Sequence, residues 1–174
     1  KKAGAKIIAL TNDPHSPLAQ LADFSIPLMA GPELAVAATK SYSAQLLISY
    51  LLVMNWARKP IHTAELVEQA SLAVSQSETV QKISEAIDLN QDLVVLGRGF
   101  SYPNAREAAL KIQETCKVSV QGMSTADYLH GPISSLNENS QVVLMAPCCM
   151  PSHLMSEAIE RIRPITKKIF WIGA

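Results

Sequence analysis

The sequence predicts an α/β fold with parallel sheets, and two observations carry this prediction. Short apolar runs, which are typical of buried strands, recur at Ala5–Thr11, Gln91–Gly99 and Gln141–Pro147. Longer segments with helical spacing lie between and beside them, above all Gly31–Lys59 and Ser101–Cys116. Strands that alternate with helices in this way favour parallel sheets covered by helices.

The first half of the chain is expected to hold two strands and a long helix. Ala5–Thr11 is closed by the loop sequence "NDPHSP", and a second strand is expected at Phe24–Leu28. In Gly31–Lys59, Pro32 suits the first helical position and Glu33 complements the positive end of a helix. The apolar run "LLISYLLVM" is far shorter than the roughly 20 residues that a membrane helix needs, so we expect a largely buried helix.

The second half is expected to repeat the alternation. Thr63–Ile87 has helical spacing and a polar face, which predicts one or two helices between two lobes. Further strands are expected at "KVSV", "QVVLMAP" and "KKIFWIG", with the helix "SHLMSEAIERI" before the last of them. In the helix that follows "LGRGF", one face gathers Ala105, Ala108, Ala109, Ile112 and Cys116. The glycines of "LGRGF" predict a tight turn, because the third glycine of a dinucleotide fingerprint would fall at Tyr102.

Charge and cysteine content narrow the classes of partner and compartment. The 15 basic and 15 acidic residues cancel, which leaves no electrostatic footprint for nucleic acid or an anionic membrane. Cys116, Cys148 and Cys149 are an odd number and a poor disulfide framework, which favours a reducing cytoplasm. The histidines and cysteines lack metal-ligand spacing, so we expect neither a metal nor another cofactor.

Two groups of titratable residues are open to more than one interpretation. Glu107, Lys111 and Glu114 share one helical face, where they are either a solvated charged face or a carboxylate and an ammonium that move a proton. His130 stands directly before Gly-Pro, either as an ordinary loop residue or as an acid/base group. Spacing alone does not decide between these interpretations.

Three stretches together resemble the sugar isomerase (SIS) family, which includes the isomerase half of glucosamine-6-phosphate synthase and stand-alone relatives. They are "GPELAVAATKSYSAQL", "LGRGFSYPNAREAALKIQE" and "YLHGPISSL". The resemblance implies a doubly wound parallel-sheet fold with two lobes, each incomplete in this chain. Residues 1–58 would be the end of the first lobe, 59–90 connecting helices, and 91–174 most of the second lobe.

The resemblance also implies roles for individual residues. Glu114 matches the base that carries a proton between C1 and C2 of the sugar, and Lys111 matches the lysine beside it. His130 matches the histidine that opens the sugar ring and reaches the neighbouring subunit's sugar, which implies a homodimer with a shared active site. The implied substrate-binding residues are Glu33, Val36, Ala37 and Ala38.

The implied activity is aldose–ketose isomerisation of an (amino)hexose 6-phosphate, most simply the glucosamine 6-phosphate and fructose 6-phosphate pair. The chain departs from the pattern of the synthase. Ala38 stands where serine is frequent, Gln113 replaces a lysine, and the serine-rich phosphate loop of the family is expected upstream of Lys1. These departures favour a stand-alone isomerising deaminase. The alternatives are the isomerase domain of a glutamine–fructose-6-phosphate aminotransferase and a non-catalytic regulator that binds a sugar phosphate.

Overall fold

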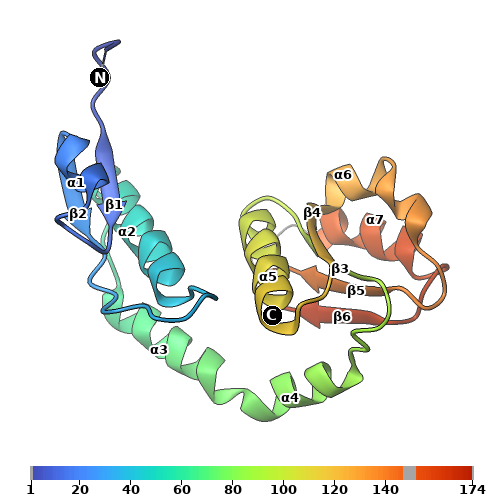
Figure 1. The fold of residues 1–174 in the computed structure, drawn as a ribbon. Coiled ribbons are helices and arrows are strands. Elements are labelled where there is room, and N and C mark those ends of the chain that lie inside the picture. The colour runs from blue at the N-terminus through green and yellow to red at the C-terminus, as the bar shows by residue number, and fades with distance from the viewer. Residues whose placement is uncertain (1, 147–151, 174) are drawn as a thin grey trace. The chain divides into compact units, whose positions relative to one another are not determined.

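The computed structural model describes residues 2–146 and 152–173 and divides into two compact units, Lys1–Ser75 and Gln76–Ala174 (Figure 1). Both units combine helices with parallel strands, so the predicted fold class is confirmed. No helix in the described ranges is long and apolar enough to cross a membrane. Cys148 and Cys149 lie outside the described residues.

The first unit contains a two-stranded parallel sheet. β1 (Ile8–Thr11) pairs with β2 (Phe24–Pro27), in agreement with the two strands expected there. The short helix α1 (Pro17–Leu21), which the sequence analysis did not predict, connects them. It begins where the hydroxyl of Ser16 accepts a hydrogen bond from the backbone N–H of Ala19 at 3.3 Å, as an N-cap does.

The long helix differs from its prediction in start and burial. α2 (Lys40–Trp56) begins at Lys40, so Pro32 is not its first helical residue. None of its residues is buried, and Trp56 is 89% exposed, so the expectation of a largely buried helix is wrong for this unit. The physical reason is area, because two strands of four residues present too little apolar surface to cover a helix of 17 residues.

The helical region after α2 forms two helices, in agreement with the one or two helices expected there. α3 (Thr63–Ser75) belongs to the first unit and α4 (Ser77–Ala86) to the second. The boundary between the units falls at the short break between these helices.

The second unit is built on a four-stranded parallel sheet in the order β4-β3-β5-β6. The chain begins in the middle of this sheet, moves out to one edge and then crosses to the other, which is the doubly wound arrangement. Leu93 of the central strand lies opposite Val120 on one side and Gln141 on the other. After α4, the elements of the second unit are β3 (Leu93–Gly97), α5 (Ser101–Cys116), β4 (Val120–Ser124), α6 (Thr125–Leu129), the 3-10 turn η1 (Pro132–Ser135), β5 (Gln141–Met145), α7 (Ser152–Ile162) and β6 (Ile169–Ile172).

The two faces of this sheet bury separate apolar cores. Leu93 and Val95 face α5, where they pack with Ala105 and Ala109. The alternate residues of the same strand point to the opposite face, because side chains alternate along a strand. There α6 and α7 cover them, in a core formed by Val94, Leu96, Tyr128, Leu129, Val142, Leu144, Ala146, Met155, Ala158 and Ile162.

Two glycines place α5 on the sheet, one in the turn that leads into the helix and one in the strand beneath it. Gly99 has φ of +55°, which a glycine adopts without strain, and it forms the predicted turn between β3 and α5. A side chain on Gly122 of β4 would place its Cβ 2.6 Å from the Cα of Arg106 and 2.7 Å from the carbonyl oxygen of Ala105. The missing side chain therefore allows α5 to lie directly on β4.

One smaller prediction in this unit is wrong. The strand expected at "KVSV" begins only at Val120, because Lys117 ends α5 in the left-handed conformation with φ of +57°. Cys116 shares a helical face with the buried alanines of α5 but is exposed, because it lies at the end of the helix.

Candidate active site

An ion pair on α5 joins two of the candidate catalytic residues. The Nζ of Lys111 lies 2.6 Å from Oε2 of Glu114, one helical turn along, and 3.5 Å from Oε1 of Glu107. The three side chains are between 21% and 24% exposed, so this is not a freely solvated face. The hydrogen bond to Glu114 is the main reason why the pKa of Lys111 is raised, and the ammonium therefore stays charged at neutral pH.

This arrangement suits proton transfer at carbon. A carboxylate is an effective base for a proton next to a carbonyl group, provided that it is held in place. The ammonium fixes one carboxylate oxygen of Glu114 and presents a positive charge beside it. Such a charge stabilises an oxyanion that develops on a substrate.

In the first unit, the carboxylate of Glu33 forms the N-terminal cap of α2. Its Oε1 accepts the backbone N–H groups of Thr39 and Lys40, each at 2.7 Å, and its Oε2 accepts the hydroxyl of Ser41. These bonds, the one from Ser41 above all, lower the pKa of Glu33 to about 2. Glu33 was expected at the positive end of a helix, and the structure places its carboxylate there from a loop that precedes the helix.

The loop closed by Glu33 carries the other predicted substrate-binding residues. Val36 is 89% exposed, and its carbonyl accepts the N–H of Ala38 at 3.0 Å, which forms a tight turn. Ala37 and Ala38 are half-buried. The hydrogen bonds of Glu33 to Thr39, Lys40 and Ser41 therefore tie this loop to the first turn of α2.

His130 is the residue at which α6 ends. Its side chain is exposed, and within the described ranges it is recorded in no side-chain hydrogen bond. Its backbone N–H donates to the carbonyl of Asp127 at 3.2 Å. The chain then passes through Gly131 into η1, so the predicted turn at Gly-Pro is present but is flanked by helical turns on both sides.

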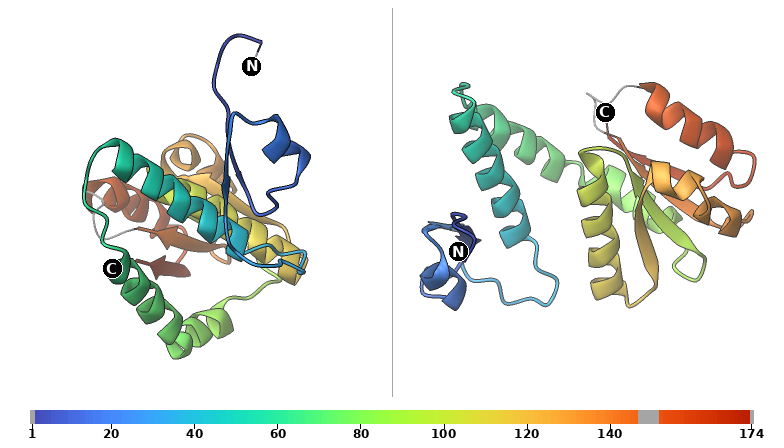
Figure 2. Two further views of the ribbon diagram at one scale, coloured as in Figure 1. Left: turned by 90° about the vertical axis from the view of Figure 1, so that its left-hand side faces the viewer. Right: turned by 90° about the horizontal axis from the view of Figure 1, so that it is seen from above.

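The sheet separates Glu114 from His130 within one chain. α5, which carries Glu114, packs on the face formed by Leu93 and Val95. α6, which ends at His130, packs on the opposite face through Tyr128 and Leu129 (Figures 1 and 2). The structure thus brings Lys111 and Glu114 together and does not bring His130 to them.

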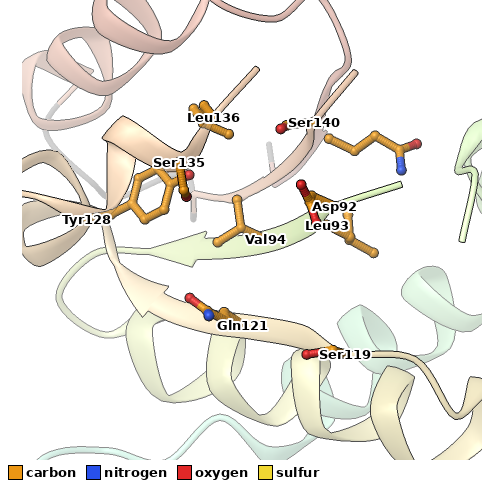
Figure 3. Close-up of a pocket in the computed structure, with 10 residues that line it drawn as sticks. Asp92, Leu93, Val94, Ser119, Gln121, Tyr128, Ser135, Leu136 and Ser140 are labelled. Atoms are coloured by element: carbon orange, nitrogen blue, oxygen red, sulfur yellow. The ribbon is translucent and has the colours of Figure 1, made fainter. Parts of the chain in front are cut away.

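A cavity of about 270 Å³ lies at the amino ends of β3, β4 and β5, and neither Lys111 nor Glu114 is among the residues that line it (Figure 3). Its wall carries hydroxyl and amide groups and one charged residue, Asp92. Burial raises the pKa of Tyr128, which points into it, to about 12. Because no basic residue lines this cavity and a carboxylate does, it does not suit a phosphate group.

The sequence analysis missed two residues that form hydrogen bonds to or beside the predicted site residues. Ser41 donates its hydroxyl to Glu33, and Arg161 donates from Nη2 to the carbonyl of Leu129 at 2.8 Å, directly before His130. Arg161 is 32 residues from its partner, and no local motif signals a contact over that separation.

Comparison with known proteins matches part of the chain to a protein family. The sequence pattern of the SIS domain family matches residues 1–55, the segment that holds β1, β2 and the loop of Glu33. Residues 1–55 thus carry the sequence pattern of an SIS domain.

The curated relatives of this chain include glutamine–fructose-6-phosphate aminotransferases (isomerizing). The protein from Aquifex aeolicus is 35% identical over 151 residues, which cover 84% of this chain and 26% of the relative. That from Clostridium tetani is 29% identical over 180 residues and covers 97% and 29%. The chain therefore spans little more than a quarter of the length of these relatives.

Solved structures share the fold over nearly the whole chain. A protein from Silicibacter pomeroyi, provisionally named a phosphosugar isomerase, has a TM-score of 0.84 at 34% identity and covers 98% of this chain and 52% of its own. The glucosamine-6-phosphate deaminase of Thermotoga maritima has a TM-score of 0.76 at 23% identity, covering 96% and 51%. At that identity the second likeness establishes the fold alone.

Proposed function

We propose that this chain is part of an aldose–ketose isomerase that acts on an (amino)hexose 6-phosphate. In this proposal Glu114 is the base that moves a proton between C1 and C2, and Lys111 stabilises the oxygen on which negative charge develops. His130 opens the sugar ring, and the loop of Val36, Ala37 and Ala38, held by Glu33, contacts the sugar. The observation that carries the proposal is the 2.6 Å contact between Lys111 and Glu114 on a partly buried face.

The position of His130 supports a homodimer with a shared active site. The sheet lies between the helix of Glu114 and the turn of His130, so one chain does not supply both groups to one sugar. A second copy would supply the histidine from its own exposed turn. The site would then hold a base from one subunit and a ring-opening group from the other.

The reaction that we favour is isomerising deamination of glucosamine 6-phosphate. After ring opening, Glu114 takes the proton from C2 and returns it to C1, which converts the C2 amine into an imine. Water adds to this imine, ammonia leaves, and fructose 6-phosphate remains. The alternative is isomerisation within a glutamine–fructose-6-phosphate aminotransferase, which the sequence similarity to those enzymes supports.

Measuring the products formed by the full-length protein distinguishes these reactions. A deaminase releases ammonia and fructose 6-phosphate from glucosamine 6-phosphate without glutamine. An aminotransferase instead forms glucosamine 6-phosphate from fructose 6-phosphate and glutamine. A regulator that only senses a sugar phosphate binds it with no turnover.

The assignment of the base is tested by Glu114→Gln, with Glu107→Gln as the matched control. Both variants remove a carboxylate that contacts Lys111, and only the first removes the proposed base. Turnover in Glu114→Gln should fall by at least ~100-fold, since general-base catalysis contributes about that much or more. Glu107→Gln should lose less than ~10-fold. Turnover of Glu114→Gln within twofold of wild type would show that another group is the base.

A further inference from the structure

The peptide group between Leu129 and His130 is held at both of its ends. Its N–H donates to the carbonyl of Asp127 at 3.2 Å, and its carbonyl accepts Nη2 of Arg161 at 2.8 Å. We propose that Arg161 is a positioning residue that fixes the backbone from which the His130 imidazole projects. This inference rests on the ring-opening role proposed above for His130.

Both ends matter because the peptide group is planar. Fixing its N–H and its C=O together fixes the orientation of the plane, and so the rotation about the bonds on either side of it. The His130 side chain leaves the backbone directly after this plane and is recorded in no side-chain hydrogen bond with another described residue. The held backbone therefore limits the positions that the imidazole reaches by rotation about its side-chain bonds.

The sequence after His130 gives less support than the sequence before it. Gly131 has no side chain with which to pack, and η1 begins only at Pro132. Before His130, Tyr128 and Leu129 are almost fully buried in the core beneath α6. Those side chains hold α6 on the sheet, whereas the contact from Arg161 acts on the carbonyl at which α6 ends.

α7, which carries Arg161, is anchored in the core of this unit. Met155, Ala158 and Ile162 of α7 are buried in the same core as Tyr128 and Leu129. Arg161 lies in the last turn of α7 and reaches from there to the end of α6. A basic side chain that donates to a carbonyl at a helix C-terminus is a favourable arrangement, because these carbonyls lack partners within the helix.

The test compares substrates that differ in their need for ring opening. The full-length protein and its variants are assayed for turnover of glucosamine 6-phosphate, which is a closed ring in water. In parallel, exchange of the C1 proton is followed in D2O with 5-deoxyfructose 6-phosphate, which lacks the hydroxyl that closes the furanose ring. The variants are Arg161→Ala, Arg161→Lys, the control Arg163→Ala and the reference His130→Asn.

Arg161→Ala should lower kcat for the closed ring by ~10-fold, or ~1.4 kcal/mol in the barrier, with KM within twofold. Its exchange with the open-chain sugar should stay within about twofold of wild type. Arg161→Lys should recover part of the loss, because an ammonium also donates to a carbonyl. Arg163→Ala removes the same charge two residues further on, without a recorded side-chain contact to α6, and should change neither rate.

Several results overturn the inference. If Arg161→Ala slows both substrates equally, or no more than Arg163→Ala does, Arg161 does not act through ring opening. If His130→Asn shows the closed-ring defect and Arg161→Ala does not, the Arg161 inference alone is wrong. If His130→Asn shows no such defect, the ring-opening role itself is wrong, and the role of Arg161 falls with it.

Discussion

Gly122→Ala tests the close contact on which the placement of Glu114 depends. A Cβ at this position would lie 2.6 Å from the Cα of Arg106, 2.7 Å from the carbonyl oxygen of Ala105 and 3.0 Å from the carbonyl carbon of Ala105. These are backbone atoms of α5, so no side-chain rotation relieves the overlap. The helix must retreat from β4 by ~1 Å to restore an ordinary carbon–carbon separation.

The loss of stability follows from the gap that this movement of α5 opens. Ala105 and Ala109 are almost completely buried against Leu93, Val95 and Val120, and a radial gap of this size forfeits a quarter to a half of each dispersion contact. Overpacked cores lose about 1–3 kcal/mol, and this site should fall at the upper end because the overlapping atoms are backbone. At an m-value of ~2 kcal/mol per M, a loss of ~3 kcal/mol moves the urea midpoint down by ~1.5 M.

The assay is urea unfolding of the full-length protein, followed by a probe in the second unit such as the fluorescence of Trp171. Gln121→Ala is the control, since Gln121 is the exposed neighbour of Gly122 in β4. An exposed substitution of this kind should change stability by no more than ~0.5 kcal/mol. A midpoint for Gly122→Ala equal to that of Gln121→Ala would mean that α5 does not rest on β4 as described.

Two further predictions concern ionisation. The pKa of Glu33 is lowered to about 2 from 4.5, so its contribution to stability is present above about pH 4.5 and is lost as the pH falls through about 2. Glu33→Gln should therefore unfold at a lower urea concentration than the wild type at pH 7. The difference between the two midpoints should become smaller as the pH falls. A difference that stays constant as the pH falls would exclude the carboxylate cap. Because the pKa of Tyr128 is raised to about 12 from 10.0, mainly by burial, its contribution is complete below about 10 and is lost as the pH rises towards 12. Tyr128→Phe should flatten this alkaline loss of stability, and an ultraviolet titration in which every tyrosine ionises near 10 would contradict the expectation.

Local pattern was sufficient for the elements that bury an apolar run. The strands Leu93–Gly97 and Gln141–Met145 and the helix Ser101–Cys116 appear where their spacing placed them. Their apolar residues lie on the sheet whatever else the chain does, because burial of such a run dominates the choice of conformation. The i, i+4 and i+7 spacing likewise placed Glu107, Lys111 and Glu114 together on α5, since helix geometry alone brings such positions side by side.

Local pattern failed at the boundaries of two elements. α2 begins at Lys40, later than predicted, and the carboxylate of Glu33 accepts the backbone N–H of Lys40 at the start of the helix. Helix propensity does not encode this contact. The strand after α5 moved to Val120 because Lys117 ends the helix in a left-handed conformation.

The sequence by itself determined the α/β class, most of the strands and helices, and the resemblance that singled out Lys111, Glu114 and His130. Only the tertiary structure decided that the sheet lies between Glu114 and His130, and that Arg161 holds the carbonyl before that histidine. The division has one physical cause. Periodicity reports which side of an element is buried, whereas the contacts between distant elements depend on how those elements pack in three dimensions.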